Sequence, residues 1–217
     1  MLVACSRDQP KAEPWIGKTF LLDTPAISST NWKKPSGLIV GNLGNYGVPQ
    51  FLFGVEAASG DDLVITLADA QQRKQDTCSP TTQLTVSGAA YPNSTITATA
   101  VPMRIISKDP TNPGQVMATI HDVTFKDILP GLASTATSQF VAIFDFVELA
   151  PFVWPGGTAE AICQASALGG DPCQICPFNG EATCMTFEAV QISTQEAAIP
   201  ITRIAPSDIP TSCSSPR

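Results

Sequence analysis

The chain has 217 residues, of which 43% are hydrophobic and only 14% are charged. Its 12 basic and 19 acidic residues give a net charge of −7, which argues against nucleic acid as a partner because few cations are available to neutralise phosphates. No stretch approaches the roughly 18 apolar residues of a transmembrane helix, and a chain this hydrophobic is not wholly disordered. The length suits one large domain, or one domain with tails.

The N-terminus carries the pattern Leu2-Val3-Ala4-Cys5, which resembles the lipobox of bacterial lipoproteins. The resemblance implies that the Cys5 thiol is acylated and that the chain is cut just before it. Residues 6–14 are polar and include proline, as in a tether, so we predict that 1–14 is a lipoprotein tether. Met1 directly precedes the pattern, so we expect the basic and apolar parts of a signal peptide upstream. The alternative is a chance match of four residues.

Six cysteines remain once Cys5 is set aside, and an even number in an exported chain predicts disulfides. They are Cys78, Cys163, Cys173, Cys176, Cys184 and Cys213. The spacing favours two local pairs, Cys163–Cys173 and Cys176–Cys184, and one long-range pair, Cys78–Cys213. A Cys173–Cys176 bridge is an alternative. A zinc site made by the four clustered cysteines is another, although only one C-x2-C half-site is present.

Short β-like segments separated by turn residues follow one another along the chain. We expect strands at 15–22, 51–55, 63–67, 83–87, 95–101, 116–125, 139–149 and 184–192. Segments 51–55 and 63–67 predict a hairpin, and the alternation of Thr with apolar residues in 95–101 predicts one wet face. Residues 25–37 are expected to form a loop that contains Trp32.

The most apolar segment is 139–149, which we interpret as a central strand, with a helix as the alternative. A helix is predicted over 158–168. Thr158 can cap its start, Glu160 suits its first turn, and Gly169-Gly170 end it.

This pattern predicts a mainly β fold: an antiparallel sandwich or barrel with one short helix and a disulfide-stapled C-terminal corner. We expect a single β-rich domain at 15–197 and a Pro/Ser-rich tail at 198–217. The chain is also similar to uncharacterised outer-membrane lipoproteins of myxobacteria and related predatory or soil bacteria. The likeness rests on the lipobox, segments 15–22 and 48–52, and the helix followed by the Cys/Pro-rich segment. It implies a location in the outer membrane or periplasm and a fold class, but no activity.

Residues that could carry chemistry are sparse. His121 is the only histidine, and no G-x-S-x-G motif occurs, so we predict no catalytic residues. Asp145 and Glu148 would face opposite sides of the predicted strand, which argues against a shared acid/base site. Segments 59–62 and 169–171 carry Gly and Asp, but neither matches the EF-hand pattern, so no metal or cofactor is predicted.

The expected function is therefore a non-enzymatic exported lipoprotein with a binding or structural role in the cell envelope. It would be held at the membrane through its N-terminal lipid, with an envelope protein or glycan as partner. The alternative is a carrier whose barrel interior accepts a lipid or another apolar ligand. Trp32 and Tyr46 stand in loop-like surroundings, where packing onto the domain is the favoured interpretation and recognition the alternative.

Overall fold

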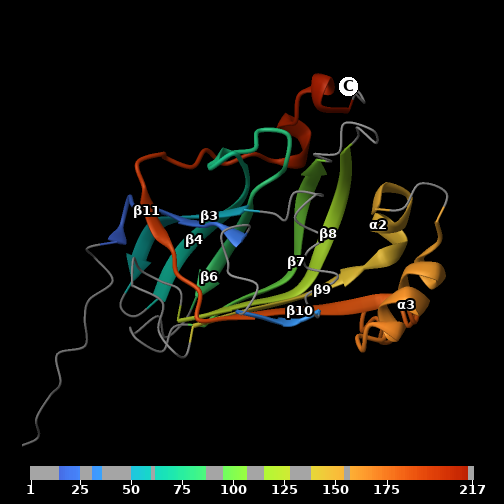
Figure 1. The fold of residues 1–217 in the computed structure, drawn as a ribbon. Helices are drawn as coiled ribbons and strands as arrows, with labels where there is room; N and C mark the ends of the chain where they lie inside the picture. Colours follow the sequence, from blue (N-terminus) through green and yellow to red (C-terminus); the bar gives the residue numbers. More distant parts are fainter. Residues whose placement is uncertain are drawn as a thin grey trace, which may run out of the picture.

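Two antiparallel β-sheets and a pair of helices at one end make up the protein (Figure 1). The computed structural model describes residues 15–24, 31–35, 50–59, 62–86, 95–106, 115–127, 138–153 and 157–214. Tyr46 and the predicted tether at 1–14, which contains Cys5, lie outside these ranges. The mainly β fold predicted from the sequence is confirmed. No helix in the described ranges is long and apolar enough to cross a membrane.

The first sheet, sheet A, has the strand order β11-β1-β3-β4-β5, with β6 also paired to β4. Its strands are β1 Thr19–Leu22, β3 Gln50–Ser59, β4 Asp62–Gln71, β5 Lys74–Gln75, β6 Thr82–Val86 and β11 Gln195–Ala197. The predicted hairpin is present as the antiparallel β3–β4 pair. Strand β1 begins later than residue 15 because Gly17, with φ of +78°, makes a turn whose N–H donates to the Val55 carbonyl.

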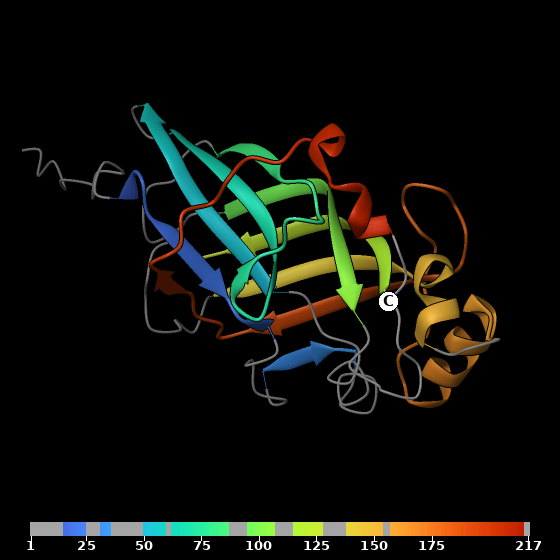
Figure 2. The same ribbon diagram turned by 90° about the horizontal axis from the view of Figure 1, so that it is seen from above.

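The second sheet, sheet B, has the order β2-β10-β9-β8-β7. Its strands are β2 Trp32–Lys34, β7 Thr95–Ile106, β8 Gln115–Lys126, β9 Gln139–Asp145 and β10 Cys184–Val190. The predicted wet face of β7 is confirmed, since Thr95 and Thr97 are exposed while Ile96 and Ala98 are buried. Seen from above, strands of sheet A cross over those of sheet B (Figure 2).

Aromatic rings fill the space between the sheets. Phe51 and Phe53 of β3 meet Phe125 of β8 and Phe140 of β9, with centroids 4.8–5.8 Å apart. The prediction of a loop over 25–37 was wrong at Trp32–Lys34, which form strand β2 beside β10. Trp32 packs edge-on against Phe140 at 6.4 Å and is 9% exposed, so the interpretation that this side chain packs onto the domain is confirmed. These contacts form one core shared by both sheets.

The prediction of a single strand over 139–149 was wrong beyond Asp145. There β9 ends and helix α2, Phe146–Val153, begins. Asp145 Oδ1 accepts a hydrogen bond from the Val147 N–H at 2.9 Å, the kind of side-chain contact that caps a helix start. The capping role of Asp145 outweighs the strand preference of the apolar residues after it.

The second helix, α3 Ala159–Leu168, is the one predicted from the sequence. Thr158 Oγ1 accepts from the Ala161 N–H at 3.3 Å and caps its start, and Gly169 follows its last turn. Two 3₁₀ turns, η4 Pro206–Asp208 and η5 Thr211–Ser214, end the described chain. Figures 1 and 2 show α2 and α3 together at one end, with the C-terminal turns near the strands of sheet B.

Candidate functional site

Three disulfides join the six cysteines in the pairs that the spacing favours. They are Cys78–Cys213, Cys163–Cys173 and Cys176–Cys184, with Cα–Cα distances of 5.4, 5.3 and 5.1 Å. The alternative Cys173–Cys176 bridge does not form. The sulfurs of Cys176 and Cys184 lie within 4.8 Å of the Asp145 carboxylate, a spacing that three ligands of one metal ion could have. Because the two sulfurs are bonded to each other, neither is a thiolate available to zinc.

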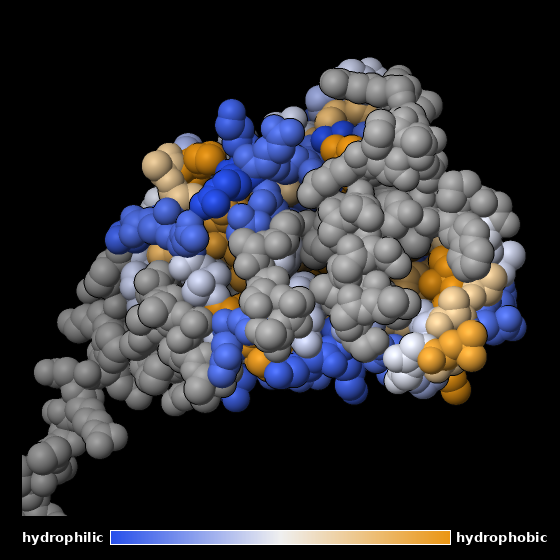
Figure 3. Space-filling view, in the orientation of Figure 1, coloured by the Kyte–Doolittle hydropathy of each residue, from blue (hydrophilic) through white to orange (hydrophobic). Residues whose placement is uncertain are grey.

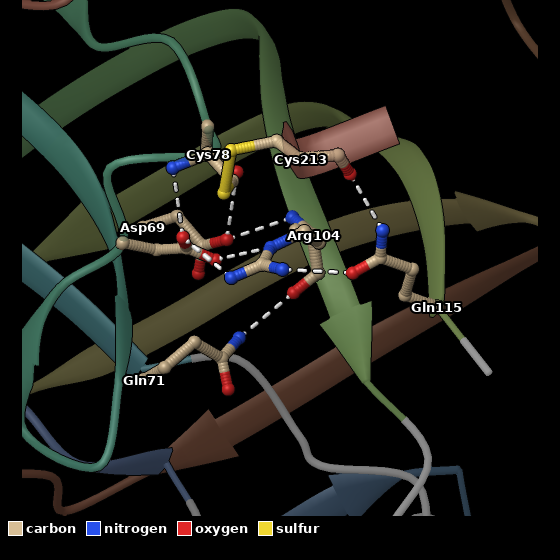
Figure 4. Close-up of polar contacts among 8 residues, drawn as sticks. Asp69, Gln71, Cys78, Arg104, Gln115 and Cys213 are labelled. Atoms are coloured by element: carbon tan, nitrogen blue, oxygen red, sulfur yellow. Dashed lines mark hydrogen bonds and ion pairs between the residues drawn. A yellow bond between two sulfur atoms is a disulfide. The ribbon is translucent and has the colours of Figure 1, made fainter. Parts of the chain in front are cut away.

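The long-range disulfide Cys78–Cys213 lies over a buried cluster of charges (Figure 4). Asp69 of β4 is 1% exposed. Its Oδ2 accepts from the Arg104 backbone N–H of β7 at 2.7 Å and from Ser79 Oγ at 2.9 Å. One carboxylate therefore connects sheet A with sheet B.

Asp76 pairs with the Arg104 side chain in the same cluster. The Arg104 Nε and Nη2 groups donate to the two oxygens of Asp76 at 2.6 and 2.7 Å, a bidentate ion pair. The Asp76 side chain is 2% exposed and that of Arg104 is 16% exposed. Removing one partner of an ion pair buried to this degree strongly destabilises a fold, because the other charge then remains buried and unpaired.

Glutamines extend this cluster to the C-terminal segment (Figure 4). Arg104 Nη1 donates to Gln115 Oε1 at 2.7 Å, and Gln115 Nε2 donates to the Cys213 carbonyl at 2.6 Å. Gln71 Nε2 donates to the Arg104 carbonyl at 2.9 Å. We call Asp69, Asp76, Arg104 and Gln115 the inter-sheet network.

Asp69 is the titratable group of this network with an unusual environment. Its pKa is raised to about 7, mainly by burial and to a smaller extent by the nearby charge of Asp76, against the opposing effect of the hydrogen bonds from the Arg104 backbone N–H and Ser79. Among the described residues, its Oδ1 is buried with no hydrogen-bond partner. The carboxyl therefore changes charge near neutral pH rather than near its usual pKa of about 4.

A pocket of about 640 Å³ opens beside the network, between sheet B and the C-terminal turns. Arg104 and Gln115 give it polar groups, and Met117, Pro206 and Ile209 give it apolar ones. The Cys78–Cys213 disulfide also lines it. The Arg104 side chain has five N–H groups, and among the described residues three of them donate to Asp76 and Gln115. The other two can donate to an acceptor on a ligand.

A second ion pair holds the C-terminal segment to sheet A. Arg203 Nε donates to Glu56 Oε1 at 2.9 Å, and Thr66 and Gln83 also donate to the Glu56 carboxylate. The hydrogen bond from Arg203 is the main cause that lowers the pKa of Glu56 to about 2, against a smaller opposing effect of burial. Ile204 adds a backbone bond from the Thr81 N–H to its carbonyl at 2.9 Å.

The residues singled out in the sequence lie elsewhere. His121 of β8 stacks on Phe178 with ring centroids 3.6 Å apart and an angle of 17° between the planes. Asp145 and Glu148 do not share a strand, since Glu148 lies in α2 and accepts from the Thr119 N–H at 2.6 Å. Segment 59–62 is described only in part, and Asp171 follows the end of α3.

Asp145 organises the cysteine-rich loop that follows α3. Its Oδ1 accepts from Thr183 Oγ1 at 2.8 Å and its Oδ2 from Asn179 Nδ2 at 3.1 Å, besides the bond from Val147. The Cys176–Cys184 disulfide beside it is buried, with both cysteines at most 1% exposed. The loop is therefore fixed to the end of β9 and the start of α2.

Comparison of the chain with protein-family models, curated proteins and solved structures finds no match. The case for a functional site therefore rests on the geometry of this structure. The inter-sheet network was not predicted from the sequence, because the predicted strands 63–67 and 95–101 ended before Asp69 and Arg104. The available signal was an acidic residue between two alanines at the end of an apolar strand.

Proposed function

We propose that the protein is a non-enzymatic envelope lipoprotein, anchored through Cys5, that binds a small molecule in the pocket beside the inter-sheet network. Three disulfides indicate an oxidising compartment outside the cytoplasm. The lipobox resemblance supports the anchor. Such an anchor would hold the protein in the outer membrane or periplasm.

The pocket is the observation that carries the binding role. Its volume of about 640 Å³ falls within the roughly 300–1,000 Å³ of typical ligand sites. Such sites combine an apolar lining with a few polar groups that orient the ligand. Here Met117 and Ile209 can contact an apolar body, while Arg104 and Gln115 lie where a hydrogen-bond acceptor would be recognised. The ligand class is an organic molecule with an apolar body and an acceptor at one end.

The carrier alternative receives less support. It needs a continuous apolar cavity inside the sheets, whereas Phe51, Phe53, Phe125 and Phe140 occupy the space between them with centroids at most 5.8 Å apart. A lipid chain would have to displace these rings.

Binding is tested with 8-anilinonaphthalene-1-sulfonate, an apolar ring system with an anionic acceptor, by titration calorimetry. We expect saturable binding of one molecule, and loss of at least tenfold in affinity in Met117→Trp, whose larger side chain fills the pocket. Ile16→Trp is the matched control, because Ile16 and Met117 are 45% and 47% exposed. Equal loss in both variants, or no binding by the native protein, would contradict the proposed role.

Anchoring is tested separately. The full-length gene, with its upstream sequence, is expressed in a bacterial host fed radiolabelled palmitate, alongside a Cys5→Ala variant. We expect label and membrane fractionation for the native protein only. Native protein without label would refute the lipid anchor while leaving the pocket untouched.

A further inference from the structure

The end of the molecule opposite β11 presents apolar side chains to solvent. Six large apolar residues are at least 41% exposed among those described, and four of them lie on α2, α3 and the cysteine-rich loop. They are Val147 at 55%, Leu168 at 93%, Ile175 at 69% and Phe178 at 41%. We call these four side chains the corner surface. In Figure 3, apolar surface gathers at the end where Figure 1 places α3.

Short-range bonds hold the corner surface in place. The disulfides Cys163–Cys173 and Cys176–Cys184 have sequence separations of only 10 and 8. Ile175 and Phe178 flank the buried Cys176, and Phe178 is stacked on His121. A mobile loop would lose conformational freedom on binding, whereas this one is already ordered, so exposed apolar groups here are prepared for contact.

The chain segment that carries the corner surface holds acidic residues and no basic ones. Residues 145–184, from the end of β9 to the start of β10, hold five of the 19 acidic residues and none of the 12 basic ones. Glu160 of α3 and Glu181 of the loop are exposed. Lys126, the nearest basic residue before this range, pairs with Gln139 at the opposite end of β9 from Asp145.

This combination selects the partner. An anionic lipid surface would be repelled by an acidic face, and a purely apolar partner would leave the carboxylates without counter-charges. We propose that the corner surface is a docking site for a protein segment that carries both apolar and Lys or Arg side chains. The apolar groups bury against Leu168, Ile175 and Phe178, and the cations pair with Glu160 and Glu181. This site is independent of the pocket.

Binding is measured by fluorescence anisotropy with synthetic labelled peptides. One is a helical amphipathic peptide of leucine and lysine. A second has glutamate in place of lysine, and a third has serine in place of leucine. We expect the leucine–lysine peptide to bind at least tenfold more tightly than either control, with an affinity that falls as salt is raised.

Variants then locate the site. Leu168→Ser and Ile175→Ser should each weaken binding of the leucine–lysine peptide about fivefold or more, since each removes apolar contact area. Ile16→Ser is the matched control and should leave binding unchanged, because Ile16 is exposed to 45% on the N-terminal side of β1.

Charge variants distinguish binding at the corner surface from non-specific attraction of the cationic peptide to an acidic protein. Glu160→Gln with Glu181→Gln should weaken binding and reduce its salt dependence more than Asp62→Asn, which lies at the start of β4. Equal effects of corner and control substitutions would overturn the proposal, as would tighter binding to vesicles of phosphatidylglycerol than to the peptide. Circular dichroism of each variant verifies that the fold is retained.

Discussion

The C-terminal segment and the cysteine-rich corner are both closed by disulfides, but they solve the problem of a buried carboxylate differently. Asp76 is neutralised by the Arg104 guanidinium, which comes from a distant strand. Asp145 accepts three hydrogen bonds from uncharged groups, those of Val147, Asn179 and Thr183. The first solution joins two sheets and a chain end, whereas the second fixes a loop and a helix start. We therefore expect the Cys78–Cys213 disulfide and the inter-sheet network to determine the stability of the whole fold. The cysteine-rich corner should affect only the order of its own loop and of helix α2.

The largest effect is expected at the long disulfide. Replacing Cys78 and Cys213 by alanine removes a cross-link with a sequence separation of 135, which the chain-entropy relation values at about 5 kcal/mol. The same change at Cys163 and Cys173, with a separation of 10, should cost about half as much. Urea denaturation of both double variants measures the difference. Equal losses of stability in the two double variants would contradict the larger stabilising effect assigned to the Cys78–Cys213 disulfide.

Arg104→Leu comes next, because it leaves Asp76 buried without its cation. We expect a loss of about 4 kcal/mol in the free energy of unfolding. Arg104→Lys should restore part of it, since an ammonium supplies the charge but not the bidentate geometry. Arg203→Leu removes the exposed partner of Glu56 and should cost much less than Arg104→Leu, because solvent screens an exposed ion pair. A comparable loss in Arg203→Leu and Arg104→Leu would contradict the central position of the inter-sheet network.

The raised pKa of Asp69 should make the stability of the fold depend on pH. Its pKa is about 7 in the folded protein and 3.8 in the reference state, so folded chains hold this proton where unfolded chains have released it. Stability from this group is present at low pH and is lost as pH rises from about 4 to 7, by on the order of 3 to 4 kcal/mol.

Asp69→Asn should remove this pH dependence. Unfolding by urea at pH 5 and pH 8 compares the two proteins above the pKa range in which Glu56 titrates, since the pKa of that group lies between about 2 and 4.5. We expect the native protein to lose stability relative to the variant between these pH values. A constant difference would show that Asp69 is charged, or neutral, throughout.

The sequence predicted much more of the corner than of the network, for a physical reason. Helix α3 has its cap and stop signals within a few residues, and the local cysteine pairs lie 8 and 10 residues apart. The strands and the hairpin also follow from local patterns. The contacts of Asp69 with Arg104 span 35 residues and depend on how two sheets pack, which no local pattern specifies. The change from strand to helix at Asp145 was not predicted, although a helix was the alternative for this segment. The apolar residues after Asp145 favour a strand, and the capping role of Asp145 depends on its backbone geometry.

A smaller effect is expected from Asp145→Ala, which removes three hydrogen bonds made by neutral donors. We expect a loss of about 2 kcal/mol, from the helix cap and from the unpaired donors of Asn179 and Thr183. Amide hydrogen exchange should increase in α2 and in the loop around Cys176, and not in β4 or β7. Increased exchange throughout both sheets would show that the corner is coupled to the rest of the core, and would contradict a purely local effect of Asp145.

The smallest effect is expected at Leu168, and it tests whether the corner presents its apolar groups or packs them. The side chain is 93% exposed, so Leu168→Ser removes almost no buried area and should change the free energy of unfolding by no more than about 0.5 kcal/mol. Ile162, on the same helix, is 8% exposed, and Ile162→Ala should cost about 2 kcal/mol or more. Thermal unfolding of the two variants gives the comparison. A large loss for Leu168→Ser would mean that this side chain supports the fold, and its exposure would then no longer favour contact with a partner. A small loss, together with weaker peptide binding, would separate the two roles of α3: one face holds the corner together and the other is available for docking.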